Sequence, residues 1–303
     1  MIIAFQGEAG AFSEAAALQF QPDCAQMPCP GFDDVFRAVE AGRATFGVLP
    51  IENSIGGTIH RNYDLLLEHE LKIIGDLELK VVHSLLALPG TPLADVKQIY
   101  SHPQALAQCD RFLRQLPGVE VVATYDTAGS AKLIKDSGNR GAAAIASERA
   151  AHVFGLEIVE TAIQDFKDNV TRFLVVGRAG AEPSHEAPAN KTTIVFTVPN
   201  EPGALFKALS VFALRGIDLT KLESRPIPGR PWEYLFYADI AVGMHEFKCG
   251  RALTHLAEFA PSLRVLGSYP SRLVRVASSI AMAESASTAA TSAPTPTPSG
   301  SPS

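Results

Sequence analysis

The chain has 303 residues, which is long for a single hydrophobic core and sufficient for two domains. Its hydrophobic content of 47% and its charged content of 19% are ordinary for a soluble globular protein. The net charge of −6, without any run of Lys or Arg, argues against a nucleic-acid-binding protein. No apolar stretch approaches the length of about 18 residues that a membrane span needs.

The spacing of cysteine and histidine predicts neither a metal site nor a disulfide framework. The four cysteines form no C-x-x-C pair, and no His stands at zinc-ligand spacing from them. We therefore expect reduced, mostly buried thiols and no cofactor, which suits a cytoplasmic protein. The chain goes straight into the apolar segment 2–5 without a basic region ahead of it, so no signal peptide is predicted.

The first part of the chain alternates between strand and helix patterns. The turn Gly7-Glu-Ala-Gly10 can present backbone N–H groups to an anion, or it can be a tight turn without a ligand. Asn53 and Ser54 follow a buried strand, where α/β proteins keep ligands, although both residue types are also common in turns. Strands are predicted at 2–5 and 46–51, and helices at 12–20, 32–41 and 63–68.

A strand-like pattern from 71 to 88 carries the chain into a second lobe. Apolar residues between 105 and 116 mark one amphipathic helix that begins after Ser101. Ser101 and Gln104 fit a capping box, and Gln108 is expected on the same helix face as Ser101. A cap is a structural role, yet a capped helix start still offers N–H groups to an anion.

The remaining alternation predicts mostly parallel sheets with crossover helices. Two such lobes, with the chain crossing between them twice, would enclose a cleft. Strands are predicted at 119–123, 142–146 and 157–161, and helices at 127–135 and 147–154.

The segment 168–178 opens with polar residues and then forms a buried strand that stops at Gly177. Side chains alternate along a strand, so Thr171 and Phe173 are expected to face one way and Arg172 the other. Thr171 is either a strand residue favoured by its β-propensity or a donor at the mouth of a pocket. The residues of this segment leave both interpretations open.

The C-terminal third follows a different pattern. After a linker at 181–190, the predicted order from Lys191 is β-α-β-β-α-β, which is the ferredoxin-like order. Residues 277–303 consist almost entirely of Ser, Ala, Thr and Pro, and we expect a disordered tail. Strands are predicted at 191–198, 217–225, 234–242 and 263–269, with helices after Asn200 and at 246–259.

Four motifs together resemble the prephenate dehydratase family, over about residues 1–270. The C-terminal module resembles an ACT domain, in which Gly203-Ala-Leu205 and Glu223-Ser-Arg-Pro226 match the phenylalanine-binding segments. The four motifs are Leu49-Pro-Ile-Glu-Asn53-Ser, Tyr100-Ser-His-Pro-Gln104, Asn169-Val-Thr171-Arg172-Phe173 and Glu223-Ser-Arg-Pro226.

The resemblance implies an α/β fold with a two-lobed, periplasmic-binding-protein-like catalytic domain at 1–180 and an α+β ferredoxin-like ACT domain at 191–272. Lobe 1 would contain about 1–76 and 162–180, and lobe 2 about 77–161. The implied reaction converts prephenate to phenylpyruvate with loss of CO2 and water. Phenylalanine would inhibit through the ACT domain, and pairing of such modules would make a homodimer or homotetramer.

The resemblance also implies roles for single residues. Thr171 would stand beside the leaving hydroxyl as a hydrogen-bond donor or proton relay, with Asn53, Ser101 and Gln108 orienting the substrate. Ser54, Arg172 and Phe173 would bind substrate, although strand alternation favours a bracing role for Arg172, and His102 is expected to be structural. The expected phenylalanine site consists of Asn200, Gly203, Ala204, Leu205, Glu223, Ser224, Arg225 and Pro226.

Two other functions remain open at this point. An arogenate dehydratase would use the same groups on a substrate that carries an ammonium, which a nearby carboxylate such as Glu52 would favour. A cytoplasmic ligand sensor would need only the donors, without chemistry.

Overall fold

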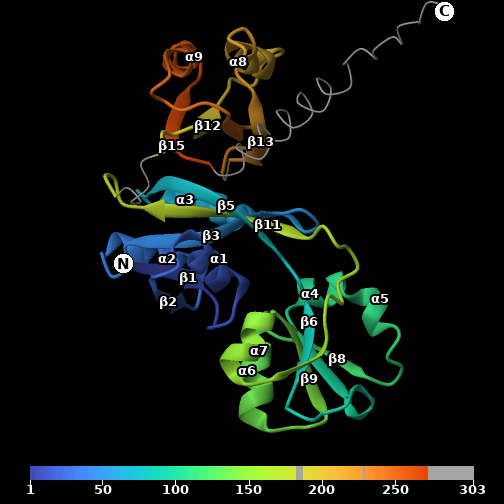
Figure 1. Cartoon of the computed structure of the whole chain (residues 1–303). Helices are drawn as coiled ribbons and strands as arrows, with labels where there is room; N and C mark the ends of the chain where they lie inside the picture. Colours follow the sequence, from blue (N-terminus) through green and yellow to red (C-terminus); the bar gives the residue numbers. More distant parts are fainter. Residues whose placement is uncertain (182–186, 228, 272–303) are drawn as a thin grey trace, which may run out of the picture.

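The computed structural model describes residues 1–181, 187–227 and 229–271. They form three sheets, each with its own helices (Figure 1). The C-terminal sheet lies at one end of the molecule beside lobe 1, and lobe 2 lies at the other end. The expected tail at 277–303 and part of the expected linker lie outside the described residues. The domain boundaries expected near 76, 161 and 180 stay predictions.

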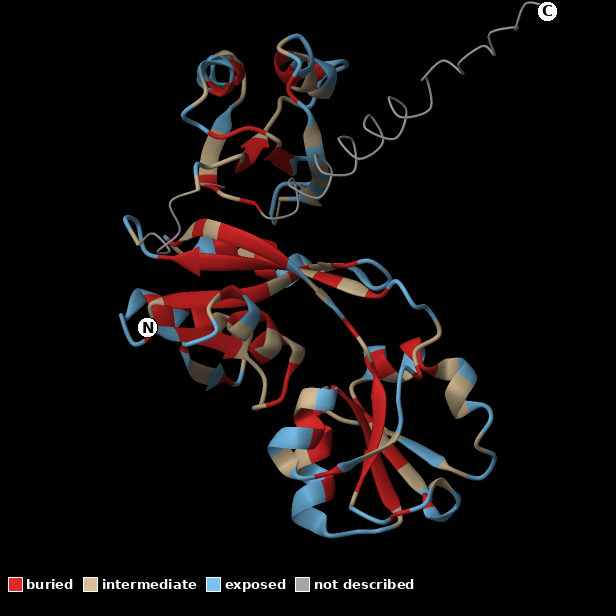
Figure 2. Ribbon diagram, viewed as in Figure 1, coloured by how far each residue is buried: buried red, intermediate tan, exposed pale blue. Residues whose placement is uncertain are grey.

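Lobe 1 is built on a six-stranded sheet with the order β2-β1-β3-β11-β5, and β4 pairs with β3. Buried residues run along its central strands (Figure 2). The apolar runs that predict strands supply these residues, among them Phe5, Val48 and Val175. The elements are β1 (Ile2–Gln6), α1 (Phe12–Phe20), β2 (Ala25–Cys29), α2 (Phe32–Glu40), β3 (Phe46–Asn53), β4 (Gly57–Thr58), α3 (His60–Glu68), β5 (Lys72–Lys80) and β11 (Val170–Gly177).

Lobe 2 is built on a five-stranded sheet with the order β10-β6-β9-β7-β8. Its core is rich in alanine, because β9 contributes five buried residues, four of them alanines. The elements are β6 (Ser84–Ala87), the short 3-10 helix η1 (Leu93–Asp95), β7 (Gln98–Ser101), α4 (Pro103–Gln108), α5 (Asp110–Leu113), β8 (Glu120–Ala123), α6 (Thr127–Ser137), β9 (Ala142–Ala146), α7 (Glu148–Phe154) and β10 (Glu157–Glu160).

The expectation of mostly parallel sheets is wrong. Strand β11 runs antiparallel to both β3 and β5, and β6 runs antiparallel to β9 and β10. The reason is the double crossing between the lobes. The strands β5, β6, β10 and β11 carry the chain out of lobe 1 and back, so the returning strands run against the outgoing ones.

The single helix expected between 103 and 116 is also wrong. The helical pattern breaks at Cys109, whose backbone leaves the helical region, so α4 ends at Gln108 and α5 begins at Asp110. Ser101 is the last residue of β7 and caps no helix. The cap of α4 is His102, whose ring nitrogen Nδ1 accepts a hydrogen bond from the backbone N–H of Gln104.

The C-terminal domain has the predicted β-α-β-β-α-β order, and its four-stranded antiparallel sheet has the order β13-β14-β12-β15. Helices α8 and α9 cover one face. The other face packs on lobe 1, where Tyr237 stacks on Tyr63 with ring centroids 4.7 Å apart. The elements are β12 (Lys191–Thr197), α8 (Ala204–Ala213), β13 (Leu219–Pro226), β14 (Tyr234–Ile240), α9 (Phe247–Ala257) and β15 (Ser262–Tyr269).

The two lobes also touch directly at the turn after β1. Ser147 Oγ donates to the carbonyl of Gly10 at 2.7 Å, and the Arg149 guanidinium pairs with Glu14 at 2.6 Å. Gly10 has φ +89°, and a Cβ at this position would lie 2.7 Å from the Cα of Ala150. This close approach requires a glycine, so the first turn of the chain serves the contact between the lobes.

The four cysteines are free and buried, as expected. Burial raises the pKa of the Cys109 thiol to about 12, which keeps it protonated and unreactive at neutral pH. Within the described residues, none of the helices combines the length and the apolar character that crossing a membrane requires.

Candidate active site

A cavity of about 430 Å³ lies between the two lobes. Asn53, Thr171 and Phe173 line it from lobe 1, at the ends of β3 and β11. Gln108 lines it from lobe 2, at the end of α4, and His83 lines it from the crossing between β5 and β6. The cavity therefore joins residues that lie far apart in the sequence.

The side chain of Asn53 is held in one orientation. Its Oδ1 accepts hydrogen bonds from the backbone N–H groups of Ile55 at 3.1 Å and Gly56 at 2.7 Å. Its Nδ2 therefore points the other way and donates to Thr171 Oγ1 at 2.9 Å and to Asn169 Oδ1 at 2.7 Å. Asn53 and Thr171 are register partners across the antiparallel pair β3–β11. Strand pairing thus sets the distance between these two groups.

Gln108 and His83 extend this network into lobe 2. Gln108 Oε1 accepts from His83 Nε2 and from Asn169 Nδ2, both at 2.9 Å. Gln108 Nε2 in turn donates to Asn53 Oδ1 at 3.4 Å. Burial of the ring lowers the pKa of His83, which favours the neutral form with its proton on Nε2.

These hydrogen bonds run in one direction, from His83 through Gln108 and Asn53 to Thr171. At the end of the chain Thr171 Oγ1 accepts from Asn53, and within the part of the chain that the structure describes its O–H donates to no protein acceptor. A hydroxyl has one proton to donate. The proton of Thr171 is therefore available to a molecule in the cavity.

Two members of this network, Asn169 and His83, are absent from the residues expected at the site. Asn169 is fully buried between Asn53 and Gln108, and its place directly before Val-Thr171 in the motif is a signal that points to it. His83 is 2% exposed in an apolar segment, where a histidine is typical of a core position. The sequence carries no separate signal for it.

Two of the expected site residues lie outside the cavity lining. Ser101 is fully buried at the end of β7, and its hydroxyl donates to the carbonyl of Ile145 at 2.6 Å. Ser54 bridges two loops, because its hydroxyl donates to the carbonyl of Asp168 at 2.8 Å and accepts from the N–H of Val170 at 3.0 Å. Both serines hold backbone segments in place, which corrects their expected contact with substrate.

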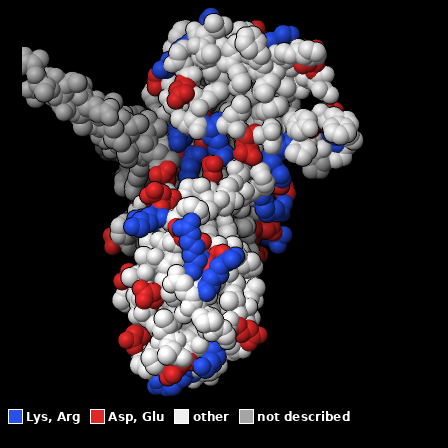
Figure 3. Space-filling model, turned by 90° about the vertical axis from the view of Figure 1, so that its right-hand side faces the viewer, with Lys and Arg blue, Asp and Glu red and all other residues white. Residues whose placement is uncertain are grey.

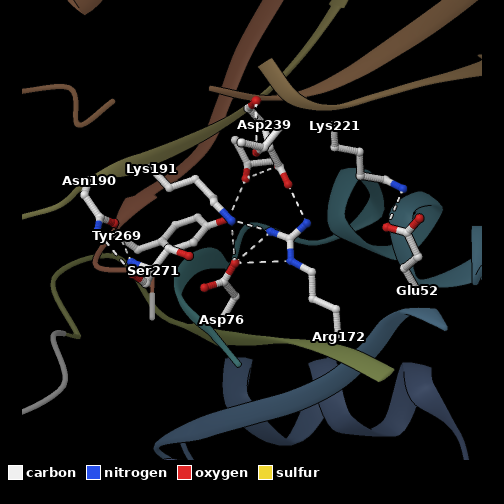
Figure 4. A network of polar contacts seen from close by, with 11 residues as sticks. Glu52, Asp76, Arg172, Asn190, Lys191, Lys221, Asp239, Tyr269 and Ser271 are labelled. Carbon is white, nitrogen blue, oxygen red and sulfur yellow. Dashed lines mark hydrogen bonds and ion pairs between the residues drawn. The ribbon is translucent and has the colours of Figure 1, made fainter. Parts of the chain in front are cut away.

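Arg172 points away from the cavity, as strand alternation predicts, and its expected contact with substrate is wrong. Its guanidinium lies on the other face of the sheet, between Asp76 of β5 and Asp239 of β14 (Figure 4). Glu52 points the same way and pairs with Lys221 of β13 at 2.8 Å. Neither side chain is among those that line the cavity.

The cavity obtains its positive potential from helix ends. No Lys or Arg occurs among the described residues that line it. The first residues of α1, α2 and α6, which are Phe12, Phe32 and Thr127, all do. A helix N-terminus carries a partial positive charge and favours anions. The cavity is thus suited to an anionic molecule, although the carboxylate of Asp126 also lines it.

The residues expected to bind phenylalanine lie on two segments of the C-terminal domain. Gly203 caps α8 with φ +80°, which is a conformation that glycine adopts readily. Along β13, alternate residues are exposed, among them Ser224 and Pro226. Glu223 and Arg225 face lobe 1 instead, where Arg225 pairs with Asp64 at 2.7 Å. Asn200 and Leu205 lie at the start of α8 and beside it, next to Ala204.

The comparisons with known proteins agree with this architecture. The family model "Prephenate dehydratase" matches residues 3–181, and the model "ACT domain" matches residues 192–243. The chain belongs to the prephenate dehydratase family, and it is a dehydratase with a C-terminal ACT domain.

Similar proteins come from both plants and bacteria. An arogenate dehydratase/prephenate dehydratase of Arabidopsis thaliana is 50% identical over 277 residues, which are 88% of this chain and 72% of the relative. The solved structure of prephenate dehydratase from Arthrobacter aurescens with L-Phe has a TM-score of 0.81 at 33% identity and covers 94% of this chain and 99% of its own. GqqA, described as a quorum quenching acylase, has a TM-score of 0.82 at 37% identity and covers 91% of this chain and 100% of its own.

The comparisons contradict the expected cytoplasmic location. The Arabidopsis relative is named as chloroplastic, and so are two others from the same organism that are 47% and 48% identical to this chain. Composition and cysteine spacing are compatible with any reducing compartment, so they do not separate the cytoplasm from a plastid.

The network predicts an effect of His83 on turnover. His83→Leu is expected to lower kcat about tenfold to a hundredfold, because Gln108 Oε1 loses a donor and its amide is free to rotate; an unmet buried group costs about 1–3 kcal/mol. His83→Gln is the matched control, since its amide retains a donor and should keep more of the rate. A steady-state assay with saturating prephenate measures both. A full rate in the leucine variant would remove His83 from the network's function.

His83 also gives the protein a pH dependence. Its folded pKa lies below the ordinary value of 6.5 because the ring is desolvated. The unfolded chain therefore binds a proton at a higher pH than the folded protein does. The stability is unaffected by this group above about pH 6.5 and falls as the pH drops below that value.

Proposed function

We propose that the cavity binds prephenate and that the Thr171 hydroxyl donates its proton in a hydrogen bond to the departing ring hydroxyl. The observation that carries this proposal is the direction of the hydrogen bonds, which leaves the Thr171 proton facing the cavity. Asn53 holds the acceptor side of the same hydroxyl, so its orientation is set before substrate binds.

The reaction needs little covalent chemistry from the protein. The bond between the ring and its carboxylate breaks, and the electron pair moves into the ring as CO2 leaves. The bond from the ring to the hydroxyl then breaks at the opposite carbon, and the hydroxyl leaves with a proton as water. The dianion takes up one proton overall and becomes the phenylpyruvate monoanion. Aromatisation of the ring drives the reaction.

Binding and water exclusion complete the proposal. The second carboxylate of prephenate, on the pyruvyl side chain, remains to the end and needs a favourable potential, which the N-termini of α1, α2 and α6 supply. The ring would lie against Phe12, Phe32 and Phe173, which are apolar residues of the lining. Such walls keep water from the carboxylate that departs, which favours loss of its charge.

The decisive experiment is to incubate the purified protein with prephenate and follow phenylpyruvate by its absorbance. Turnover is expected. A protein that binds prephenate without forming phenylpyruvate would be the ligand sensor that the sequence left open.

Arogenate is a second substrate that one observation favours. Relatives from plants carry arogenate dehydratase in their names. Glu52 does not support it, since this carboxylate pairs with Lys221 away from the cavity. Asp126 does, because it is the one acidic side chain among the described residues of the lining. Its carboxylate accepts from the N–H groups of Gly129 at 2.6 Å and Glu8 at 3.3 Å, and it retains its negative charge toward an ammonium.

The ratio of kcat/KM for arogenate to that for prephenate is expected to fall at least about tenfold in Asp126→Asn. A charge pair at contact distance contributes about 1–4 kcal/mol between bulk water and a protein surface, and the neutral amide removes it. Asparagine still caps α6, so the helix is retained. Side-by-side kinetics with both substrates measure the ratio. An unchanged ratio would exclude Asp126 from the discrimination.

Regulation completes the function. We propose that phenylalanine binds beside Gly203 and the exposed side chains of β13, between two copies of the chain. Strand β13 lies at the edge of its sheet, so its outer hydrogen-bonding groups are open to a partner strand. The apolar side chains of Phe206 and Leu214, which are 77% and 81% exposed, lie on the adjacent α8 and at its end. A homodimer or homotetramer would cover them.

Phenylalanine is expected to inhibit turnover and to stabilise the fold. At a concentration of 100 Kd, a ligand that binds the folded state raises the free energy of unfolding by about 2.7 kcal/mol. Thermal unfolding with L-phenylalanine, with D-phenylalanine as the control, measures this effect beside an activity assay. If neither activity nor the unfolding temperature responds to L-phenylalanine, the regulatory proposal fails.

A further inference from the structure

The paired strands β3 and β11 have two functional faces. Asn53 and Thr171 are register partners, and the preceding and following residues, Glu52 and Arg172, are register partners as well. Asn53 and Thr171 line the cavity. Because side chains alternate along a strand, Glu52 and Arg172 stand on the opposite face, which the ACT domain covers (Figure 4).

Arg172 is the centre of a buried charge cluster between the catalytic domain and the ACT domain. Its guanidinium lies 2.8 Å from Asp76 of β5 and 2.5 Å from Asp239 of β14. Lys191 of β12 pairs with Asp76 at 3.0 Å, which balances two anions with two cations. The four side chains are between 0% and 12% exposed. Buried charges of this kind hold their partners in place, since a lost contact leaves a charge without compensation.

A second contact joins β3 to the ACT domain. Lys221 of β13 is 9% exposed and lies 2.8 Å from Glu52, and its ammonium is 3.7 Å from Glu223. Glu223 also accepts from Thr58 Oγ1 at 3.1 Å, and Thr58 is the register partner of Glu52 in β4. Charged groups of both domains meet below the ACT domain, as the surface shows (Figure 3). Strand β13, which bears the expected effector segment, thus contacts a strand of the active site directly.

We propose that Asp239 and Lys221 are positioning residues for the dehydration: through Arg172 and Glu52 they set the place of Thr171 and Asn53, and phenylalanine acts on turnover through these two contacts. The proposal rests on the proposed conversion of prephenate in the cavity and on phenylalanine binding to the ACT domain. Its distinct content is the route by which one domain acts on the other.

The geometry explains why a small movement suffices. The Asn53–Thr171 hydrogen bond of 2.9 Å crosses the same strand pair that Glu52 and Arg172 anchor on its other face. A rotation of the ACT sheet that shifts Lys221 against Asp239 would slide β3 relative to β11. A misplacement of about 1 Å at reacting groups costs about a hundredfold in rate. Phenylalanine needs only to prefer one of two such arrangements.

The test compares contacts that end on the catalytic strands with one that does not. Asp239→Asn and Lys221→Met each remove one contact, and Lys221→Arg retains the charge opposite Glu52. Arg264→Met is the matched control, because Arg264 of β15 also crosses between the domains but donates to the carbonyls of Leu67 and His69 at the end of α3. For each variant, kcat, KM, the phenylalanine Kd by calorimetry and the extent of inhibition are measured.

Asp239→Asn and Lys221→Met are expected to lower kcat at least about tenfold, to leave KM within about threefold, and to reduce maximal inhibition while the phenylalanine Kd stays within about threefold. Lys221→Arg and Arg264→Met should behave as wild type. Wild-type kcat and inhibition in Asp239→Asn and Lys221→Met would overturn the proposal. If Asp239→Asn does not fold, the comparison of Lys221→Met with Lys221→Arg decides alone. A wild-type protein that forms no phenylpyruvate would instead overturn the proposed function itself.

Discussion

Thr171→Val is expected to lower kcat by about 10²–10⁴, which is the usual cost of losing one donor or proton-transfer group at a reacting centre. Valine has nearly the shape of threonine, so the 8% exposed position remains filled and the loss is confined to the hydroxyl. Asn53 Nδ2 keeps its contacts with Asn169 and with the carbonyl of Val170. The fold should therefore survive, and steady-state kinetics with prephenate measure the effect.

Thr171→Ser is the matched control. It restores the hydroxyl on a smaller side chain and should recover most of the rate. A valine variant with the wild-type kcat and an unchanged unfolding temperature would show that the hydroxyl takes no part in the reaction.

Asp76→Asn is expected to give the largest loss of stability in this protein, about 3–5 kcal/mol in the free energy of unfolding. Its carboxylate is fully buried and accepts from both Arg172 and Lys191. The amide leaves these two cations with Asp239 as their one remaining anion within the buried cluster that the structure describes. Denaturant unfolding followed by circular dichroism measures the change.

Asp110→Asn provides the comparison, since Asp110 also pairs with an arginine. The pair with Arg114 is on the surface, with side chains 51% and 77% exposed, and such pairs contribute about 0–1 kcal/mol. Equal effects of the two substitutions would contradict the assignment of Asp76 as the centre of a buried ion pair.

Local sequence patterns predict much of the fold and part of the site. Asn53 and Thr171 stand where apolar strands meet polar residues, and the structure places both at the cavity. Strand alternation separates Thr171 from Arg172 and needs no tertiary information. The order of the ACT domain follows from strand and helix periods alone. In each case the cause lies within a few residues along the chain.

The patterns fail where a side chain's partner is distant in sequence. Arg172 bonds to Asp76 and Asp239, which lie 96 and 67 positions away. His83 bonds to Gln108, 25 positions away, and nothing beside it marks that contact. Ser101 shows the opposite error. Its capping-box spacing with Gln104 is a local signal, yet β7 extends through Ser101, and the cap falls to His102.

The place of β11 has a consequence for how the protein is made. Strands β3 and β5 are not hydrogen-bonded to each other, because β11 lies between them, and β11 is translated after the whole of lobe 2. A nascent chain that has not yet reached residue 170 leaves a gap in its first sheet on the ribosome. Lobe 2 has all five of its strands at residue 160 and is able to form first. Completion of lobe 1 then waits for the strand that also brings the catalytic threonine.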